Sequence, residues 1–501
     1  NSILMNSILQ WVINSFYQKG IIDMNSNVAI EYRKDITDYP SGKYYYNPSN
    51  KYPEYPFGDE IAGEENPVYD MVRNTLYSMG YDRDNFGKKE WNPLGDIIKK
   101  NQKILVKPNW VMHINKAIDD ENDLRALVTH PSVVRAIVDY VYIALTNSGE
   151  IYVADAPMQE CNLEEALKKA GYDELFEFWR KYIPNIKIRD LRHYSTVIEN
   201  NVILEKKDND YNESIVVDLK DKSYHKLGTN NNGKYKVSQY MGEDTQNYHN
   251  EKEHKYVLNK IVLEADVIIN IPKPKCHRLA GMTAALKNMV GVIYDKNSLP
   301  HRKIGSVEEG GDAYKKKNIF KHYMEVLDEK KTDSSLNKHY NIAQFYSFFE
   351  KVFYVLGSVI SRDKVRIGGW YGNDTIWRTI LDLNTIINYG DKNGNICDEK
   401  QRKMLILGDM IICGQKNGPV KPSPKTLGMV MLSENSYAFD STMCKIMGFK
   451  YDMIKYIAEY AINNEQNIEV IFNGKKNLLS NMQIDNEWKF EPHDMWKEYE
   501  N

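Results

Sequence analysis

The chain has 501 residues, 42% of them hydrophobic and 27% charged, a composition that indicates a folded globular protein. Its 66 basic and 69 acidic residues leave a net charge of -3, which excludes the strong positive field typical of nucleic-acid-binding proteins. The apolar run in residues 1–22 is interrupted by polar side chains and has no basic leader. We therefore expect neither export nor a membrane span, and a cytoplasmic location.

The five cysteines are scattered, with no C-x-x-C pair and an odd total. This pattern favours reduced thiols over disulfides. An iron–sulfur cluster needs about four closely grouped thiolates, so we expect no intrinsic iron–sulfur site.

The first elements along the chain are an irregular segment and a helix. Residues 36–60 are rich in tyrosine and proline, which break helix and strand periodicity, and they predict an ordered N-terminal wrap on the surface. From Pro67 the apolar residues recur at helical spacing as far as Leu76, and Gly80 marks the end.

A strand–helix–strand unit follows. Residues 103–106 predict a buried strand that ends at Lys107-Pro108-Asn109, because proline cannot continue a central ladder. Residues 131–145 predict a helix with proline at its start, and residues 151–154 predict a second strand that ends at Asp155. Such units are parallel and right-handed, so the two strands share their carboxyl edge.

The rest of the sequence predicts a polar insertion followed by further strands and helices of the core. Residues 200–255 read as an insertion with a small antiparallel flap around residues 214–217. The later core elements are strands at 265–271, 403–412 and 428–432, and helices at about 280–290 and 438–447.

Together these elements predict an α/β fold with a mostly parallel sheet and flanking helices. We divide the chain into an N-terminal extension packed on the core, an α/β core with insertions near 200–255 and 300–400, and a C-terminal extension. Their bounds are residues 1–100, 101–460 and 461–501.

Polar and cationic residues follow four of the predicted strands, and in a parallel sheet these strand ends meet at one edge. The densest group is Lys273, Lys275 and His277 between two stiffening prolines, with a predicted helix N-terminus near Leu279. We predict an anion site with His277 as acid or base and Asp155 as its orienting partner. The predicted ligand-binding residues are Lys107, Asn109, His130, Lys273, Lys275, Thr283, Lys287, Asn288 and Asn417.

Several of these residues have a plainer interpretation. The basic segment could be a solvated turn, and His130 could be a helix cap rather than a ligand. A His/His/Asp metal site is the less favoured alternative, because no pair of these residues has helix-type ligand spacing. The P-loop, G-x-G-x-x-G and G-x-S-x-G motifs are absent, so the usual nucleotide and serine-hydrolase signatures are missing.

The chain resembles the domain-of-unknown-function family 362 over about residues 101–460. The resemblance rests on an ordered set of motifs, namely Lys107-Pro108-Asn109, Thr129-His130-Pro131, Asp155-Ala156-Pro157, the run from Ala265 to His277, residues 285–291, Asn417-Gly418-Pro419 and Ala438-Phe439-Asp440. Residues 47–57, 91–95 and 369–378 look like a longer subgroup, without the fused ferredoxin domain of some members. The resemblance implies an α/β fold and a shared site around the lysines, histidines and aspartate named above, and it implies no particular reaction.

Two functions fit these expectations. The first is an enzyme acting on a phosphorylated or carboxylated small molecule, as a transferase or ligase rather than a hydrolase, since the wrap and insertions could exclude water. The second is a non-catalytic accessory protein that handles a ligand or cofactor with a partner, suggested by the aromatic residues 43–57 and the irregular residues 300–340. We expect no nucleic-acid or membrane partner. A protein partner or a homo-oligomer fits either function, and the sequence names no metal or cofactor.

Overall fold

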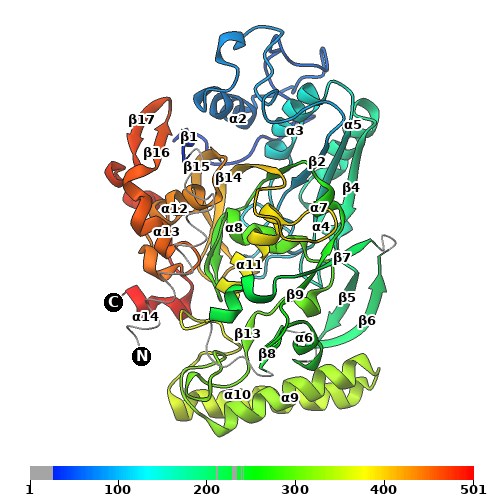
Figure 1. The fold of residues 1–501 in the computed structure, drawn as a ribbon, viewed down its shortest axis with the longest axis vertical. Helices are drawn as coiled ribbons and strands as arrows, with labels where there is room; N and C mark the ends of the chain where they lie inside the picture. Colours follow the sequence, from blue (N-terminus) through cyan, green and yellow to red (C-terminus); the bar gives the residue numbers. More distant parts are fainter. Residues whose placement is uncertain (1–25, 210–212, 228–233, 238–239, 241, 501) are drawn as a thin grey trace.

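The computed structural model describes residues 26–500 except 210–212, 228–233, 238–239 and 241. In the described residues the fold is α/β, built on one 11-stranded sheet with helices on both faces (Figure 1). The strands of this sheet are β1 (Val28–Tyr32), β2 (Lys103–Lys107), β3 (Glu150–Asp155), β4 (Ile186–Asp190), β10 (Val267–Asn270), β11 (Lys275–His277), β12 (Gly281–Thr283), β14 (Lys403–Gln415), β15 (Ser423–Ser433), β16 (Glu469–Phe472) and β17 (Lys475–Leu478).

The main path of the sheet runs β17-β16-β1-β15-β14-β10-β2-β3-β4. Strands β14, β10, β2, β3 and β4 are parallel to their neighbours in this order, while β15 is antiparallel to both β14 and β1. The chain builds outward from β2 to β4 and then returns to place β10 on the other side of β2. This reversal creates a crevice at the carboxyl ends of β2 and β10, the usual place for a ligand in such sheets.

Smaller strands and the helices surround this sheet. The remaining strands are β5 (Tyr194–Glu199), β6 (Val202–Asp208), β7 (Ser214–Asp218), β8 (Tyr235–Lys236), β9 (Lys255–Asn259) and β13 (Arg302–Lys303). The α-helices are α2 (Pro67–Ser78), α3 (Pro131–Leu145), α4 (Leu163–Lys169), α5 (Tyr172–Tyr182), α6 (Gly242–Tyr248), α7 (Ile261–Glu264), α8 (Ala285–Asn288), α9 (Ile319–Leu336), α10 (Tyr340–Ser361), α11 (Ile376–Tyr389), α12 (Ser436–Ile446), α13 (Ala458–Asn464) and α14 (Lys497–Glu500). None of the helices in the described part of the chain is long and apolar enough to cross a membrane.

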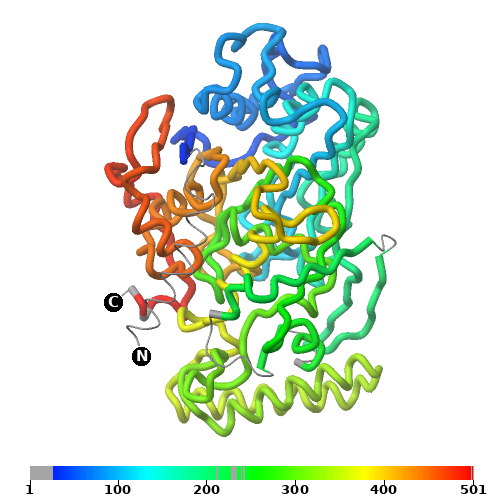
Figure 2. The backbone as a smooth tube through the Cα atoms, viewed as in Figure 1, coloured from blue at the N-terminus to red at the C-terminus, as the bar shows by residue number. Residues whose placement is uncertain are grey.

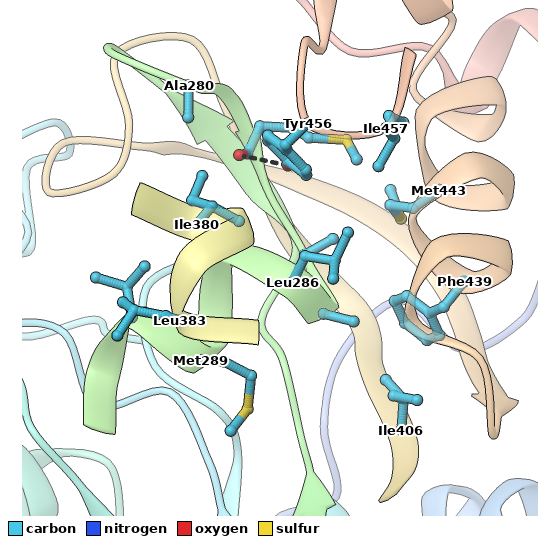
Figure 3. Close-up of a cluster of buried hydrophobic side chains, with 14 of the residues drawn as sticks. Ala280, Leu286, Met289, Ile380, Leu383, Ile406, Phe439, Met443, Tyr456 and Ile457 are labelled. Atoms are coloured by element: carbon cyan, nitrogen blue, oxygen red, sulfur yellow. Dashed lines mark hydrogen bonds between the residues drawn. The ribbon is translucent and has the colours of Figure 1, made fainter. Parts of the chain in front are cut away.

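The strands have apolar residues on both faces because helices cover both. In β10, Val267 and Ile269 join the core on the face of α3 and α5, whereas Ile268 joins the core on the face of α11 and α12. Figure 3 shows the second core, where Leu286 and Met289 lie beside Ile380 of α11 and Phe439 of α12. This two-sided burial explains why the central strands read as continuous apolar runs.

The first strand–helix–strand unit matches the sequence prediction. Helix α3 begins at Pro131 and ends at Leu145, between β2 and β3, as the proline and the glycine beyond its end predicted. The flap predicted around residues 214–217 is β7, which pairs with β9 in antiparallel orientation.

The predicted helix at 280–290 is wrong in its first half. Residues Gly281–Thr283 form β12, which pairs with Lys275–His277 of β11, and only Ala285–Asn288 are α-helical. The predicted helix N-terminus near Leu279 is therefore absent. Thr283 and Lys287 do not share a helix face, because Thr283 belongs to a strand.

Both extensions contribute strands to the main sheet. Strand β1 lies between β15 and β16, so the segment before residue 100 pairs with the segment after residue 460. Figure 2 shows this blue N-terminal strand beside the orange and red end of the chain. The antiparallel end of the sheet thus depends on both extensions.

The aromatic residues of the wrap are mostly buried. Tyr46, Tyr55 and Phe57 lie in the core with α3 and α5, whereas Tyr44 is 40% exposed. Tyr45 donates a hydrogen bond to the Gly171 carbonyl at the start of α5. The wrap therefore packs onto this helical layer, and these side chains form no exposed aromatic surface.

Candidate functional site

A cavity of about 440 Å³ lies at the carboxyl ends of β2 and β3 and beside β11 and β12. Eight of the sequence-predicted site residues line it: Asn109, Asp155, Lys275, His277, Thr283, Lys287, Asn288 and Asn417. Its wall also receives residues from both insertions and from the C-terminal extension, namely Val237, Leu299, His301 and His493. The fold thus brings together segments that lie far apart in the sequence.

A buried ion pair forms the floor of the site. Lys107 Nζ lies 2.7 Å from Asp155 Oδ1, and both side chains are almost fully buried. The other oxygen, Asp155 Oδ2, accepts a hydrogen bond of 2.7 Å from the Trp110 backbone N–H. Gly291 passes directly above this pair, and a Cβ at Gly291 would lie 2.2 Å from Asp155 Oδ1. The glycine is therefore required by this close approach.

Asn288 connects the floor to the next strand. Its Oδ1 accepts hydrogen bonds from Lys107 Nζ at 3.2 Å and from Asn109 Nδ2 at 2.8 Å. Its Nδ2 donates to Asn270 Oδ1 at 2.7 Å. With these bonds Asn288 holds the ends of β2 and β10 in place, which is a positioning role.

Among the described residues, Lys275 Nζ is held by neutral oxygens only. Its Nζ donates to Asn109 Oδ1 at 2.7 Å and to the Leu127 carbonyl at 2.5 Å. Burial, together with the nearby Lys273, lowers the pKa of Lys275 well below its usual value. Such a lysine gains an ion pair when an anion enters the cavity.

His277 has a defined tautomer. Its Nδ1 accepts hydrogen bonds of 3.1 Å from the backbone N–H groups of Leu279 and Ala280, so Nδ1 is unprotonated and Nε2 carries the hydrogen. Burial and the neighbouring Lys287 hold the pKa of His277 well below its usual value. This geometry favours a neutral ring that donates a hydrogen bond from Nε2, rather than a base that accepts a proton there.

His301 has the opposite tautomer. Its Nδ1 lies 2.9 Å from the Leu299 carbonyl, which can only accept, so Nδ1 carries the hydrogen and Nε2 is unprotonated. Burial and Lys287 lower the pKa of His301 to about 3. His301 Nε2 is therefore the ring nitrogen in this cavity that can accept a proton or a hydrogen bond from a ligand.

Two further lysines have pKa values near neutrality. Burial and nearby cations lower the pKa of Lys287 to about 7, and no described residue forms an ion pair or hydrogen bond with its Nζ. Burial and Arg192 lower the pKa of Lys296 to about 8, and its Nζ donates to the Ala156 carbonyl at 2.9 Å.

Two buried oxygens at the cavity have no hydrogen-bond partner among the described residues. They are Thr283 Oγ1 and Gln159 Oε1, and both residues line the cavity. A buried polar group without a partner costs about 1–3 kcal/mol, which a hydrogen bond to a ligand would offset.

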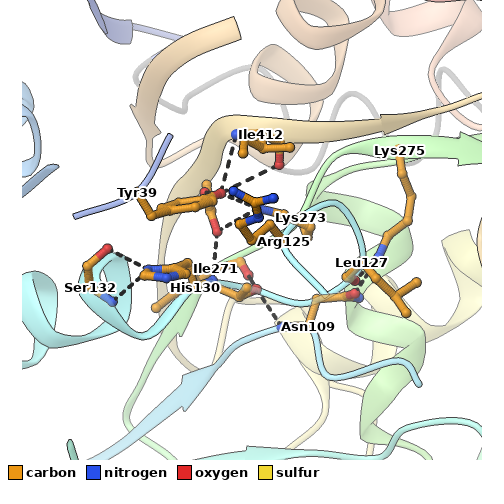
Figure 4. A network of polar contacts seen from close by, with 12 residues as sticks. Tyr39, Asn109, Arg125, Leu127, His130, Ser132, Ile271, Lys273, Lys275 and Ile412 are labelled. Atoms are coloured by element: carbon orange, nitrogen blue, oxygen red, sulfur yellow. Dashed lines mark hydrogen bonds and ion pairs between the residues drawn. The ribbon is translucent and has the colours of Figure 1, made fainter. Parts of the chain in front are cut away.

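His130 and Lys273 do not line this cavity, but lie in a buried polar network beside the cavity residues Asn109 and Lys275 (Figure 4). Lys273 Nζ pairs with Asp409 Oδ2 at 3.0 Å and donates to the Tyr39 hydroxyl. His130 Nδ1 caps α3 by accepting from the Ser132 N–H at 3.3 Å, and its ring stacks on Tyr39 with centroids 3.9 Å apart. The geometry of His130 is thus that of a helix cap.

The comparison with known families gives a match that covers most of the chain. The model described as "Domain of unknown function (DUF362)" matches residues 104–205 and 212–445, which is more than half of the chain. The chain belongs to the DUF362 family. No curated protein and no solved structure matches it.

The matched residues of the DUF362 chain include most of the cavity wall, from Asn109 to Asn417. His493 lies beyond the match, in the C-terminal extension. In the described parts of the chain, no three His, Cys, Asp or Glu residues are grouped so that they could hold a metal ion.

The polar residues of this DUF362 cavity that sequence reasoning did not select include Gln159, Lys296, His301 and His493. His301 and Lys296 lie in or next to a segment interpreted as an insertion away from the site. His301 follows directly after Pro300, a rigid position that resembles the proline-flanked Lys275 segment, and this was the one available signal. No sequence pattern pointed to His493, because its position at the cavity depends on how the C-terminal extension packs against the core.

Proposed function

We propose that this DUF362 protein is an enzyme acting on an anionic small molecule, phosphorylated or carboxylated, bound at the carboxyl ends of the strands. The observation that carries the proposal is the charge of the cavity wall. Its cationic side chains are Lys275, Arg278, Lys287, Lys296 and Lys421, and its acidic ones are Asp155 and Glu160. Asp155 is already paired with Lys107, so the wall has an excess of positive charge for a ligand.

The lysines are suited to binding because an anion would stabilise their charged forms. An ordinary surface lysine is already protonated and solvated, whereas Lys287 has a pKa of about 7 in this buried position. A bound phosphate or carboxylate raises the pKa of a neighbouring lysine, so binding is accompanied by proton uptake near neutral pH.

The two histidines support a proton-transfer role. His277 offers an N–H donor and His301 offers an unprotonated nitrogen, and both line the same cavity. In this arrangement His301 Nε2 accepts a hydrogen bond from the reacting group, while His277 Nε2–H donates a hydrogen bond to an oxygen of the ligand. An anion bound beside His301 would raise the low pKa of this ring and so favour transfer of the proton to Nε2. Asp155 holds Lys107 and the Trp110 N–H, which positions the floor of the site.

The roof of the cavity favours a transferase or ligase over a hydrolase. It comes from the insertions and the C-terminal extension, through Val237, Leu299 and His493, rather than from the tyrosine-rich wrap. We propose that these segments cover a bound ligand and exclude water, which a group transfer requires and a hydrolysis does not.

Native mass spectrometry of the purified full chain, searching for a retained anionic metabolite, is the direct test. We expect Lys275→Met and Lys287→Met each to lose the metabolite, and His301→Gln to keep it but to abolish its turnover. Lys99→Met is the matched control, because Lys99 is an exposed lysine before the start of β2, at the opposite edge of the sheet. Retention of the metabolite by both cavity variants would reject the anion site.

The alternative is a non-catalytic protein that delivers a ligand or cofactor to a partner through the same cavity. It predicts retention of a metabolite without turnover, in the wild-type protein as in His301→Gln. The burial of Tyr46, Tyr55 and Phe57 removes the exposed aromatic surface that favoured this alternative.

A further inference from the structure

The helical hairpin formed by α9 and α10 carries an apolar face that no part of the described chain covers. It lies along one end of the molecule, at the lower edge in Figure 1. Six large side chains of α10 define the face, with exposed fractions between 36% and 71%. They are Phe345, Phe348, Val352, Val355, Val359 and Ile360. From Phe345 to Val359 they recur at alternating spacings of three and four residues, so they form one continuous stripe along the helix.

The opposite side of α10 packs against α9 and the rest of the protein. It carries small residues and one glutamate that forms ion pairs. Ala343, Ser347 and Gly357 are buried there, and a Cβ at Gly357 would lie 2.9 Å from Lys321 Cγ. Glu350 is also buried and pairs with Lys331 and Arg366. The helix is thus arranged with its small residues inward and its large apolar residues outward. In a monomeric soluble protein, an exposed apolar stripe of this extent marks an interaction surface.

Most of the unpaired charges around the stripe are positive. Six exposed basic residues of the hairpin and its ends make no ion pair with any described residue. They are Lys316, Lys330, Lys338, Lys351, Arg362 and Lys364. Most acidic residues of the hairpin and its ends are held in ion pairs, such as Asp328 with Lys331, Glu325 with Arg302 and Asp363 with Lys321, whereas Asp333 is exposed and accepts a hydrogen bond from Asn337. An apolar stripe with an unbalanced positive border is the pattern of a helix that lies on an anionic lipid surface.

We propose that the outer face of α10 docks on an anionic lipid membrane, with the helix lying in the interface and its phenylalanines inserted among the acyl chains. The helix lies on the membrane and does not cross it, in keeping with its hydropathy. A second copy of the chain suits the surface less well, because two such borders would bring lysines against lysines without acidic partners. None of the six stripe residues lines the cavity, so this inference is independent of the proposed reaction.

Cosedimentation of the full chain with vesicles tests the proposal. We expect binding to phosphatidylcholine vesicles containing about one third phosphatidylserine, and binding weaker by roughly tenfold or more to phosphatidylcholine alone. Binding to the anionic vesicles should decrease as salt is added. Lys338→Glu/Lys351→Glu should weaken it by a similar factor, since each lysine near an anionic surface contributes about 1 kcal/mol.

The apolar contribution is tested with Phe345→Gln/Phe348→Gln/Val355→Gln, which should abolish vesicle binding. The matched control is Val216→Gln/Ile462→Gln, which changes side chains that are 52% and 61% exposed on other elements. Equal thermal unfolding temperatures for these variants would show that the fold is intact.

Failure of the wild-type chain to bind anionic vesicles overturns the proposal, as does undiminished binding by the triple variant. If light scattering shows a dimer that the triple variant converts to a monomer, the face is an interface between copies and the lipid proposal is wrong.

Discussion

His277 and His301 line one cavity, and each ring contacts the backbone through Nδ1, but in opposite hydrogen-bonding roles. Nδ1 of His277 accepts from two N–H groups, whereas Nδ1 of His301 donates to the Leu299 carbonyl. Two neutral histidines therefore present a donor and an acceptor to the same ligand. This pairing depends on the chain connection after β11 and on the turn at Leu299, which are unrelated in sequence.

The two tautomers can be observed directly. Long-range proton–nitrogen correlation spectra of histidine-labelled protein should assign the Nε2–H form to His277 and the Nδ1–H form to His301. Both rings should remain neutral at pH 5, because burial lowers the pKa of His301 to about 3 and that of His277 well below its usual value. His277→Asn and His301→Gln identify the signals, and a protonated ring at pH 5 would contradict the assignment.

Asp155→Asn should destabilise the protein strongly. The substitution leaves Lys107 buried without its counter-charge, and breaking a buried pair in this way costs about 3–5 kcal/mol. Lys107→Met combined with Asp155→Asn should recover part of that loss, because no isolated charge then remains. Denaturant unfolding of the two variants measures the difference. Equal destabilisation by the single and the double change would argue against the pair as the cause.

Gly291→Ala should destabilise the site although alanine is a small residue. The added Cβ would lie 2.2 Å from Asp155 Oδ1 and 2.8 Å from Lys107 Nζ, so the ion pair or the backbone must move. We expect a loss of roughly 1–3 kcal/mol in unfolding free energy, typical of overpacking. Gly63→Ala is the matched control, since nothing lies within 4 Å of its Cβ position. If Gly291→Ala and Gly63→Ala both changed the unfolding free energy only slightly, the backbone at Gly291 would be able to shift away from the Lys107–Asp155 pair at little cost.

Lys287 should make stability depend on pH above neutrality. Its folded pKa of about 7 lies below the ordinary lysine value of 10.5, so between these values the unfolded chain binds more protons than the folded chain. The free energy of unfolding therefore rises with pH across this window, by about 1.4 kcal/mol per unit of pKa difference at most. Lys287→Met should flatten this rise and stabilise the protein near pH 7. Denaturant unfolding of wild type and variant between pH 7 and 10 checks the sign.

Anion binding should depend on pH in the opposite direction. The free protein loses the Lys287 proton as the pH rises through about 7, and the neutral amine attracts an anion less strongly. Calorimetry with the retained metabolite in buffers of different ionisation enthalpy should therefore show proton uptake near pH 7. Absence of proton uptake would contradict the prediction. Proton uptake that is unchanged in Lys287→Met would show that another group binds the proton.

His130 should act as a helix cap and not as a ligand residue. His130→Ala should cost about 1 kcal/mol of stability through loss of the cap, while His130→Asn should retain most of it. Neither change should alter anion affinity, because His130 lies outside the cavity. Thermal unfolding and calorimetry of the two variants separate these roles. A loss of anion affinity in His130→Asn would instead indicate that His130 contributes to ligand binding.

The α/β class, the β2–α3–β3 unit and the family could all be inferred from the sequence, because they depend on local signals. Burial on both faces gives continuous apolar runs such as residues 265–271, and proline and glycine mark the ends of α3. The rule that parallel strands share a carboxyl edge then placed Asn109, Asp155, Lys275 and His277 at one site.

The tertiary structure alone decided which residues face the cavity and in what chemical state. Lys273 and Lys275 are two residues apart, yet one pairs with Asp409 and the other lines the cavity, because prolines on either side of Lys273 redirect the chain into β11. The histidine tautomers and the depressed lysine pKa values come from burial and from distant backbone groups. Spacing along the chain carries no information about such contacts, because desolvation and hydrogen bonding depend on distances in space.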